Sequence, residues 1–147
     1  MAWMYRLQYE TFLRRCFRCL WPIPSTKARE ELIDITRTVE EDVRSSGIKE
    51  GLCVVYVPHT TAAVTVNEHA DPDVRQDILK QLKVLVPKDC DYSHLEGNSD
   101  AHIKSSLIGA SQAIPVNEGR LVLGTWQGVF FCEFDGPRSR SFYVTLT

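Results

Sequence analysis

Three of the four histidines lie in short polar motifs, and their imidazoles are the side chains best suited to chemistry. His59 follows a proline and precedes two threonines, His94 lies in a polar stretch, and His102 comes eight residues later. Imidazole titrates near neutral pH and is the commonest metal ligand. Three imidazoles match the protein ligands of an open catalytic zinc site. Spacing alone does not distinguish such a site from three unrelated histidines.

Polar residues follow each histidine motif. Glu68 can orient a histidine or act as a base, whereas Asp71, directly before a proline, is better explained as a helix cap. The stretch from Tyr92 to His102 is a long polar loop with a glycine that permits a tight path. Long polar loops in compact domains are often functional, and the alternative is a solvated connection.

A third group of polar residues lies near the C-terminus. Trp126 beside Gln127 can stack on and hydrogen-bond a planar heterocycle, and Arg138 can hold a phosphate through two bonds. The alternative is a buried Trp126 in a sheet turn, with Arg138 paired to Asp135. The motifs G-x-S-x-G, G-x-G-x-x-G and Walker A are absent from the sequence.

Composition narrows the class of protein. The chain has 147 residues, 44% of them hydrophobic, which predicts one domain with its own core. The net charge of −2 shows no excess of basic residues of the kind that binds nucleic acid, and no apolar run is long enough to span a bilayer. Two of the five cysteines, Cys53 and Cys132, fall in apolar strand-like runs. We therefore expect a reducing, cytoplasmic location.

Between residues 35 and 108, helical periodicity appears in three places. Val39 and Val43 repeat with Ile35, behind a capping box of Thr38 and Glu41 and before Gly47. A second helix begins at the Asp71-Pro72 pair and stops at Pro87.

The third helix is predicted to be capped by Ser99 and to run to Ile108. Ile103 and Leu107 are expected to face its core, with His102 about 100° away from them.

Strand-like segments surround these helices without regular alternation between strand and helix. Seven are predicted, at residues 28–35, 52–57, 61–66, 113–116, 120–123, 128–134 and 141–146. This order predicts an α+β fold, with a mainly antiparallel, sandwich-like sheet and two or three helices. Several strands are strongly apolar and the helices are few, so a homo-oligomer is expected to cover them.

Residues 1–22 differ from the rest of the chain and are treated as an N-terminal extension of uncertain status. Apolar residues recur at helical spacing over 12–20, and basic residues outnumber the single acid. Pro22 and Pro24 make 21–24 a poor strand. The single domain is therefore expected to occupy 23–147.

With these motifs assembled, the chain resembles the YjbQ-like family from about Ser25 to the C-terminus. The matching segments are 58–64, 67–68, 71–73, 92–94, 97–98, 101–104, 111–127 and 133–138. The resemblance implies a sandwich-like α+β domain that assembles as a homotrimer. It also implies a secondary, weak thiamine-phosphate synthase activity, which joins a pyrimidine pyrophosphate to a thiazole phosphate and releases pyrophosphate.

The leading hypothesis is a metal-assisted enzyme acting on a phosphorylated small molecule. His59, His94 and His102 would bind zinc, or magnesium with a pyrophosphate substrate, and Glu68 would act as base. The expected ligand contacts are Thr60, Thr61, Lys104, Thr125, Trp126, Gln127, Asp135 and Arg138. The alternative is a non-catalytic trimeric module that binds a phosphorylated or heterocyclic metabolite through the same residues. Neither hypothesis involves nucleic acid or a membrane.

Overall fold

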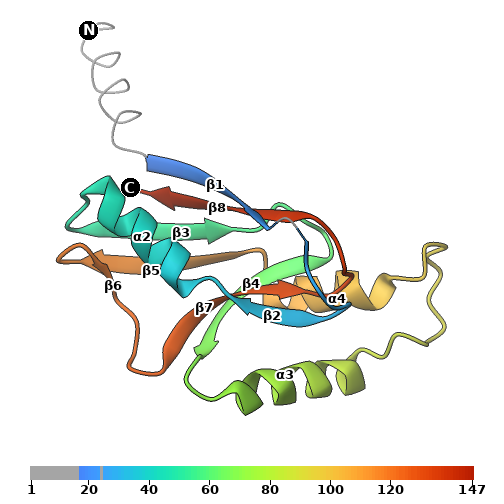
Figure 1. Ribbon diagram of the computed structural model, residues 1–147. Helices are drawn as coiled ribbons and strands as arrows, with labels where there is room; N and C mark the ends of the chain where they lie inside the picture. The colour runs from blue at the N-terminus through green and yellow to red at the C-terminus, as the bar shows by residue number, and fades with distance from the viewer. Residues whose placement is uncertain (1–16, 24) are drawn as a thin grey trace, which may run out of the picture.

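Two antiparallel sheets and three helices form the structure, a computed structural model that describes residues 17–23 and 25–147 (Figure 1). The α+β prediction is therefore confirmed. The helices are α2 (Thr36–Ser46), α3 (Pro72–Leu85) and α4 (Ser99–Ile108). The strands are β1 (Phe17–Ile23), β2 (Glu31–Asp34), β3 (Gly51–Tyr56), β4 (Ala62–Glu68), β5 (Ser111–Asn117), β6 (Arg120–Leu121), β7 (Gln127–Glu133) and β8 (Arg140–Leu146).

The eight described strands form one five-stranded and one three-stranded sheet. The five-stranded sheet runs β1-β8-β3-β5-β6, and the three-stranded sheet runs β2-β7-β4. β7 is the central strand of the smaller sheet, with β2 and β4 antiparallel to it on either side. Its C-terminal end, at Glu133, therefore meets the first residues of both neighbouring strands.

Both faces of β7 are buried within the chain. Because successive side chains of a strand point to opposite faces, Val129 and Phe131 enter the core between the two sheets. Phe130 and Cys132 enter a second core with Leu82 of α3. One chain therefore covers β7 by itself, since the larger sheet lies on one face and α3 and α4 lie on the other.

The observed helix caps agree only in part with those predicted from the sequence. Asp71 accepts a hydrogen bond from the Asp73 amide, 2.9 Å, and Gly47 adopts the left-handed conformation at the end of α2. The predicted capping box of α2 was wrong. Its first turn is instead held by Asp34, which accepts hydrogen bonds from both the amide and the hydroxyl of Thr36.

The prediction that residues 21–24 make a poor strand was wrong for 21–23. Residues 17–23 form β1, which pairs with β8 along its whole length. Pro22 is tolerated because β1 is an edge strand, where a missing N–H interrupts no ladder. Trp21 donates to Asp42 of α2, which connects the strand to the core. The helical spacing noted over 12–20 gives way to strand from Phe17, and its earlier part lies outside the described residues.

Among the described residues, no helix has the length and apolar character that crossing a membrane requires.

Candidate functional site

Helix α4 turns its charged face inward. Asp100 and Lys104 are fully buried, whereas Ile103 is 38% exposed and Leu107 63% exposed. The prediction that these two apolar residues face the core was wrong. The helix is compatible with this orientation because its buried charges find partners on the segment before β2, namely Arg29 and Glu30.

Lys104 lies between two carboxylates. Its ammonium is 2.7 Å from Glu30 Oε1 and 3.0 Å from Asp100 Oδ2, and its side chain is 1% exposed. Arg29 donates to Asp100 at 2.8 Å and to Asp135 at 3.0 Å. The two cations and three carboxylates thus form one alternating, mostly buried network, in which Lys104 is already occupied by protein partners.

Asp135 connects this network to the turn after β7. It accepts from the Asn98 amide at 2.9 Å and from Arg138 Nη2 at 2.7 Å. Burial alone would raise the pKa of Asp135, but the hydrogen bonds from Asn98 and Arg138 hold that pKa below its usual value. The pairing of Arg138 with Asp135, one of two alternatives from the sequence, is present.

Glu133 forms a second buried pair beside this network. Both of its oxygens accept from the Arg140 guanidinium, at 2.6 and 2.7 Å, and one also accepts the amides of Phe134 and Asp135. Arg140 donates in addition to the Thr61 hydroxyl at 2.8 Å. The Thr61 hydroxyl is therefore a hydrogen-bond partner within the fold, and Thr60 beside it is exposed.

His59 is held next to this pair by the backbone of β8. Its Nε2 lies 3.0 Å from the Ser141 amide nitrogen and 3.1 Å from the Ser141 carbonyl oxygen. The tautomer with an unprotonated Nε2 accepts the amide N–H. Partial burial lowers the pKa of His59, and the Arg140 charge lowers it further.

This arrangement predicts a pH dependence of stability. Because the folded pKa lies below the unfolded value of about 6.5, the stability from neutral His59 is present above that pH. It is lost as the pH falls through the folded pKa. His59→Gln keeps an acceptor for Ser141 but cannot titrate, so it should lose less stability between pH 7 and pH 5 than the wild type. Urea unfolding at several pH values measures this, and parallel pH curves for the two proteins would contradict it.

His94 and His102 come together as predicted. Their rings meet edge to face with centroids 5.5 Å apart. They line an open pocket of about 390 Å³ with Tyr92, Ser93, Ser99 and Ile103 at the start of α4. This pocket, here called the histidine pocket, combines two imidazoles with two hydroxyl-bearing serines.

His59 does not join this pair. Among residues 17–23 and 25–147, no three His, Cys, Asp or Glu side chains are grouped so that they could hold a metal ion. The donor set fits zinc by chemistry, but one chain supplies only two adjacent imidazoles, and its residues alone do not complete the site.

Four of the predicted site residues lie at the other end of β7. Glu68 pairs in register with Gln127, and Thr125 and Trp126 form the exposed turn before that strand. Trp126 is 63% exposed, so the alternative of a buried indole was wrong. A seven-residue strand is about 20 Å long. Within one chain, these residues are separated from Asp135 and Arg138 by that length.

Arg29 and Glu30 were not predicted as site residues. Their stretch was interpreted only as the beginning of an edge strand, although four of residues 27–31 are charged. A run of charges next to a buried strand was the available signal, but it does not say which charges turn inward.

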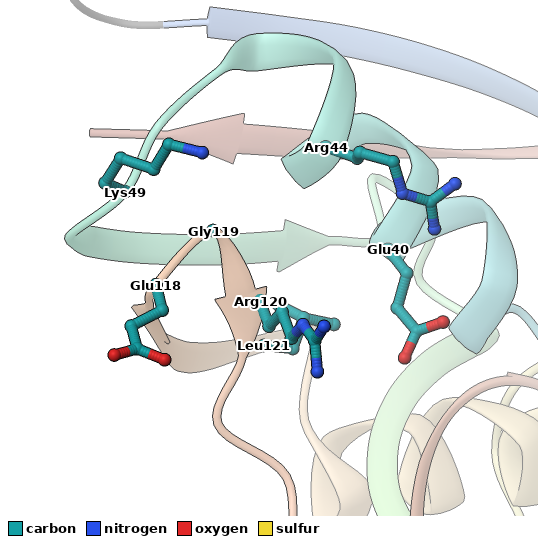
Figure 2. A pocket seen from close by; sticks show the side chains of 7 residues that line it. All are labelled: Glu40, Arg44, Lys49, Glu118, Gly119, Arg120 and Leu121. Carbon is teal, nitrogen blue, oxygen red and sulfur yellow. The ribbon is translucent and has the colours of Figure 1, made fainter.

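A further pocket, of about 560 Å³, lies away from all of these residues (Figure 2). Helix α2 supplies Glu40 and Arg44, the turn between β5 and β6 supplies Glu118 and Gly119, and β6 supplies Arg120. It is lined mainly by exposed charged side chains and includes none of the residues predicted from the sequence.

The fold and these residues define a class of small two-sheet α+β proteins with a buried ionic network under one helix. The family model "UPF0047 protein YjbQ-like" matches residues 23–147. The chain belongs to this family.

Similar proteins come from archaea and bacteria. A UPF0047 protein of Methanocaldococcus jannaschii is 57% identical over 121 residues, covering 82% of this chain and 88% of the relative. The protein YugU of Bacillus subtilis is 52% identical over 122 residues, covering 82% and 92%.

Solved structures agree with the fold. A YjbQ/UPF0047 family protein of Clostridium acetobutylicum, described as uncharacterized, has a TM-score of 0.86 and 50% identity. The match covers 88% of this chain and 99% of that one. A protein of unknown function from Sulfolobus solfataricus has a TM-score of 0.86 and 39% identity, covering 89% and 96%.

Proposed function

We propose that this protein is an enzyme that acts on a phosphorylated small molecule at the histidine pocket. The observation that carries the proposal is the pairing of His94 and His102 at the mouth of an open pocket. Two imidazoles within reach of one ligand can act as general acid and general base at neutral pH.

The specific reaction that we propose is a weak thiamine-phosphate synthase activity, as the family resemblance implies. The reaction releases pyrophosphate, so the leaving group needs both charge stabilisation and proton transfer. The two imidazoles can supply these, and the first turn of α4 adds a positive dipole end beside them.

We further propose that a homotrimer completes the site. His59 of a neighbouring copy would supply the third imidazole for a divalent ion, either zinc or, with pyrophosphate, magnesium. When bound, such an ion neutralises the charge of the leaving group. Exposed apolar residues around the pocket support an assembly through this face, namely Leu95, Ile103 and Leu107. The free thiols of Cys53 and Cys132 fit a reducing, cytoplasmic location.

Substitution of a pocket histidine tests the enzyme hypothesis. His102→Ala should reduce pyrophosphate release from the pyrimidine pyrophosphate and the thiazole phosphate by at least about 100-fold, because it removes one acid–base group. The control is His69→Ala, since His69 pairs with Asp34 outside the pocket. Equal rates in both variants would contradict the proposal. Substrate binding that depends on His102 without any turnover would instead support the non-catalytic trimeric module.

Metal content separates the shared metal site from the acid–base role. If the ion is held between copies, His59→Ala and His102→Ala should each lose bound metal as purified. Mixed trimers of the two variants should recover part of it, since some interfaces then carry all three histidines. Metal content that is unchanged in both variants would remove the metal from the proposal and leave the acid–base role to be judged by turnover.

A further inference from the structure

A third pocket, distinct from the histidine pocket and from the pocket of Figure 2, lies on the opposite side of α4 from the histidine pocket. It has a volume of about 420 Å³ and is lined by Ala28, Arg29, Glu30, Lys83, Pro87, Lys88, Asp89 and Lys104. His102 and Lys104 are two positions apart on the helix, or about 200°, so they point to opposite sides. This pocket is here called the lysine pocket.

Two buried polar atoms without a hydrogen-bond partner belong to residues that line the lysine pocket. They are Arg29 Nε, an N–H donor, and Glu30 Oε2, an acceptor. The Glu30 side chain is only 5% exposed. Leaving such groups unpaired destabilises the fold, and more so when they are charged. Two unpaired groups of opposite kind at one pocket indicate a ligand that both accepts and donates.

The charges around the lysine pocket say which part of the ligand is the acceptor. Four cations line it against two carboxylates, and two of the cations, Lys83 and Lys88, lie on its exposed rim. The Lys104 ammonium has three N–H donors and uses two of them on Glu30 and Asp100. A phosphate group offers enough oxygens to accept from several of these donors at once.

Glu30 specifies the other part of the ligand. Its Oε2 forms an ion pair with the Lys83 ammonium at 3.6 Å, which is beyond hydrogen-bond range, and it accepts no hydrogen bond. An ammonium, amino or hydroxyl group of the ligand would satisfy it.

We propose that the lysine pocket binds a small phosphate ester that also carries an ammonium or hydroxyl donor. The phosphate lies against Arg29, Lys83, Lys88 and Lys104, and the donor group reaches Glu30. This site is additional to the histidine pocket and needs neither turnover nor metal there.

Calorimetric titration of the full chain with 2-aminoethyl phosphate tests the site. We expect saturable binding, with ethyl phosphate about tenfold weaker because it lacks the donor for Glu30. Lys83→Ala should weaken binding of 2-aminoethyl phosphate about tenfold. Lys80→Ala is the matched control, because Lys80 is also exposed on α3 and pairs with Asp77 instead. Both lysine variants should fold, since both side chains are exposed.

A second variant tests the donor part of the proposal. Glu30→Gln should remove the preference for 2-aminoethyl phosphate over ethyl phosphate. Absence of saturable binding, or equal weakening by Lys83→Ala and Lys80→Ala, would overturn the proposal. Because the readout is binding at this pocket, a negative result leaves the proposed enzyme activity standing, and failure of that activity leaves this site standing.

Discussion

Replacing Glu133 with glutamine is expected to lower the free energy of unfolding by about 3–5 kcal/mol, the cost of breaking a buried ion pair. Glu133 is fully buried and accepts five hydrogen bonds, two of them from the Arg140 guanidinium. Glutamine has the same shape but puts an NH₂ donor where one carboxylate oxygen now faces other donors. It also leaves the Arg140 charge unpaired at a side chain that is almost fully buried.

Urea unfolding at pH 7 measures the change, and Glu96→Gln is the matched control. Glu96 is exposed, and within the described part of the chain it forms an ion pair with His94 alone, at 3.8 Å. This variant should therefore lie within about 0.5 kcal/mol of the wild type. A loss of less than about 1 kcal/mol in Glu133→Gln would contradict this prediction. It would mean that Arg140 is stabilised without the carboxylate, by water or by rearrangement of its side chain.

The apolar pattern predicted most of the fold because the spacing of apolar residues along the chain reflects which faces of a helix or strand are buried. β7 reads as an apolar run because the chain buries both of its faces, and α3 begins at Asp71-Pro72 because both residues satisfy an N-terminal helix turn. β1 was not predicted because Pro22 within it and Pro24 just after it argue against a central strand, whereas an edge strand tolerates Pro22.

Pattern alone failed for α4. An apolar stripe normally faces the core, and Ile103 and Leu107 form such a stripe. The buried face instead carries Asp100 and Lys104, which is stable only because Glu30 and Arg29 lie opposite them. Those partners are about 70 residues away in the sequence, so local spacing carries no information about them.

The candidate site was predictable in its chemistry but not in its grouping. The sequence correctly placed His94 and His102 together, since the loop and helix between them are short. It also put Glu68 and Trp126 with the same site, whereas β7 holds these residues at its opposite end. Only pairing within the sheet determines which end of a strand a turn residue occupies, and pairing was not fixed by the motifs.

Replacing Lys104 with methionine is expected to cost about 3–5 kcal/mol of stability. Methionine fills the space of the aliphatic chain, but Glu30 and Asp100 then keep buried negative charges without their shared cation. Lys80→Met is the control, because its exposed pair with Asp77 should contribute no more than about 1 kcal/mol.

A double variant shows whether this loss comes from the ion pair or from packing. In Lys104→Met with Glu30→Leu both members of the closest pair are apolar, while Asp100 keeps Arg29 as its partner. Replacing a whole buried pair by apolar residues can be close to neutral, so the double variant should be more stable than Lys104→Met alone. If instead the two losses simply add, the charges are not coupled, and the inward orientation of α4 must depend on its small buried residues, Ala101 and Ser105.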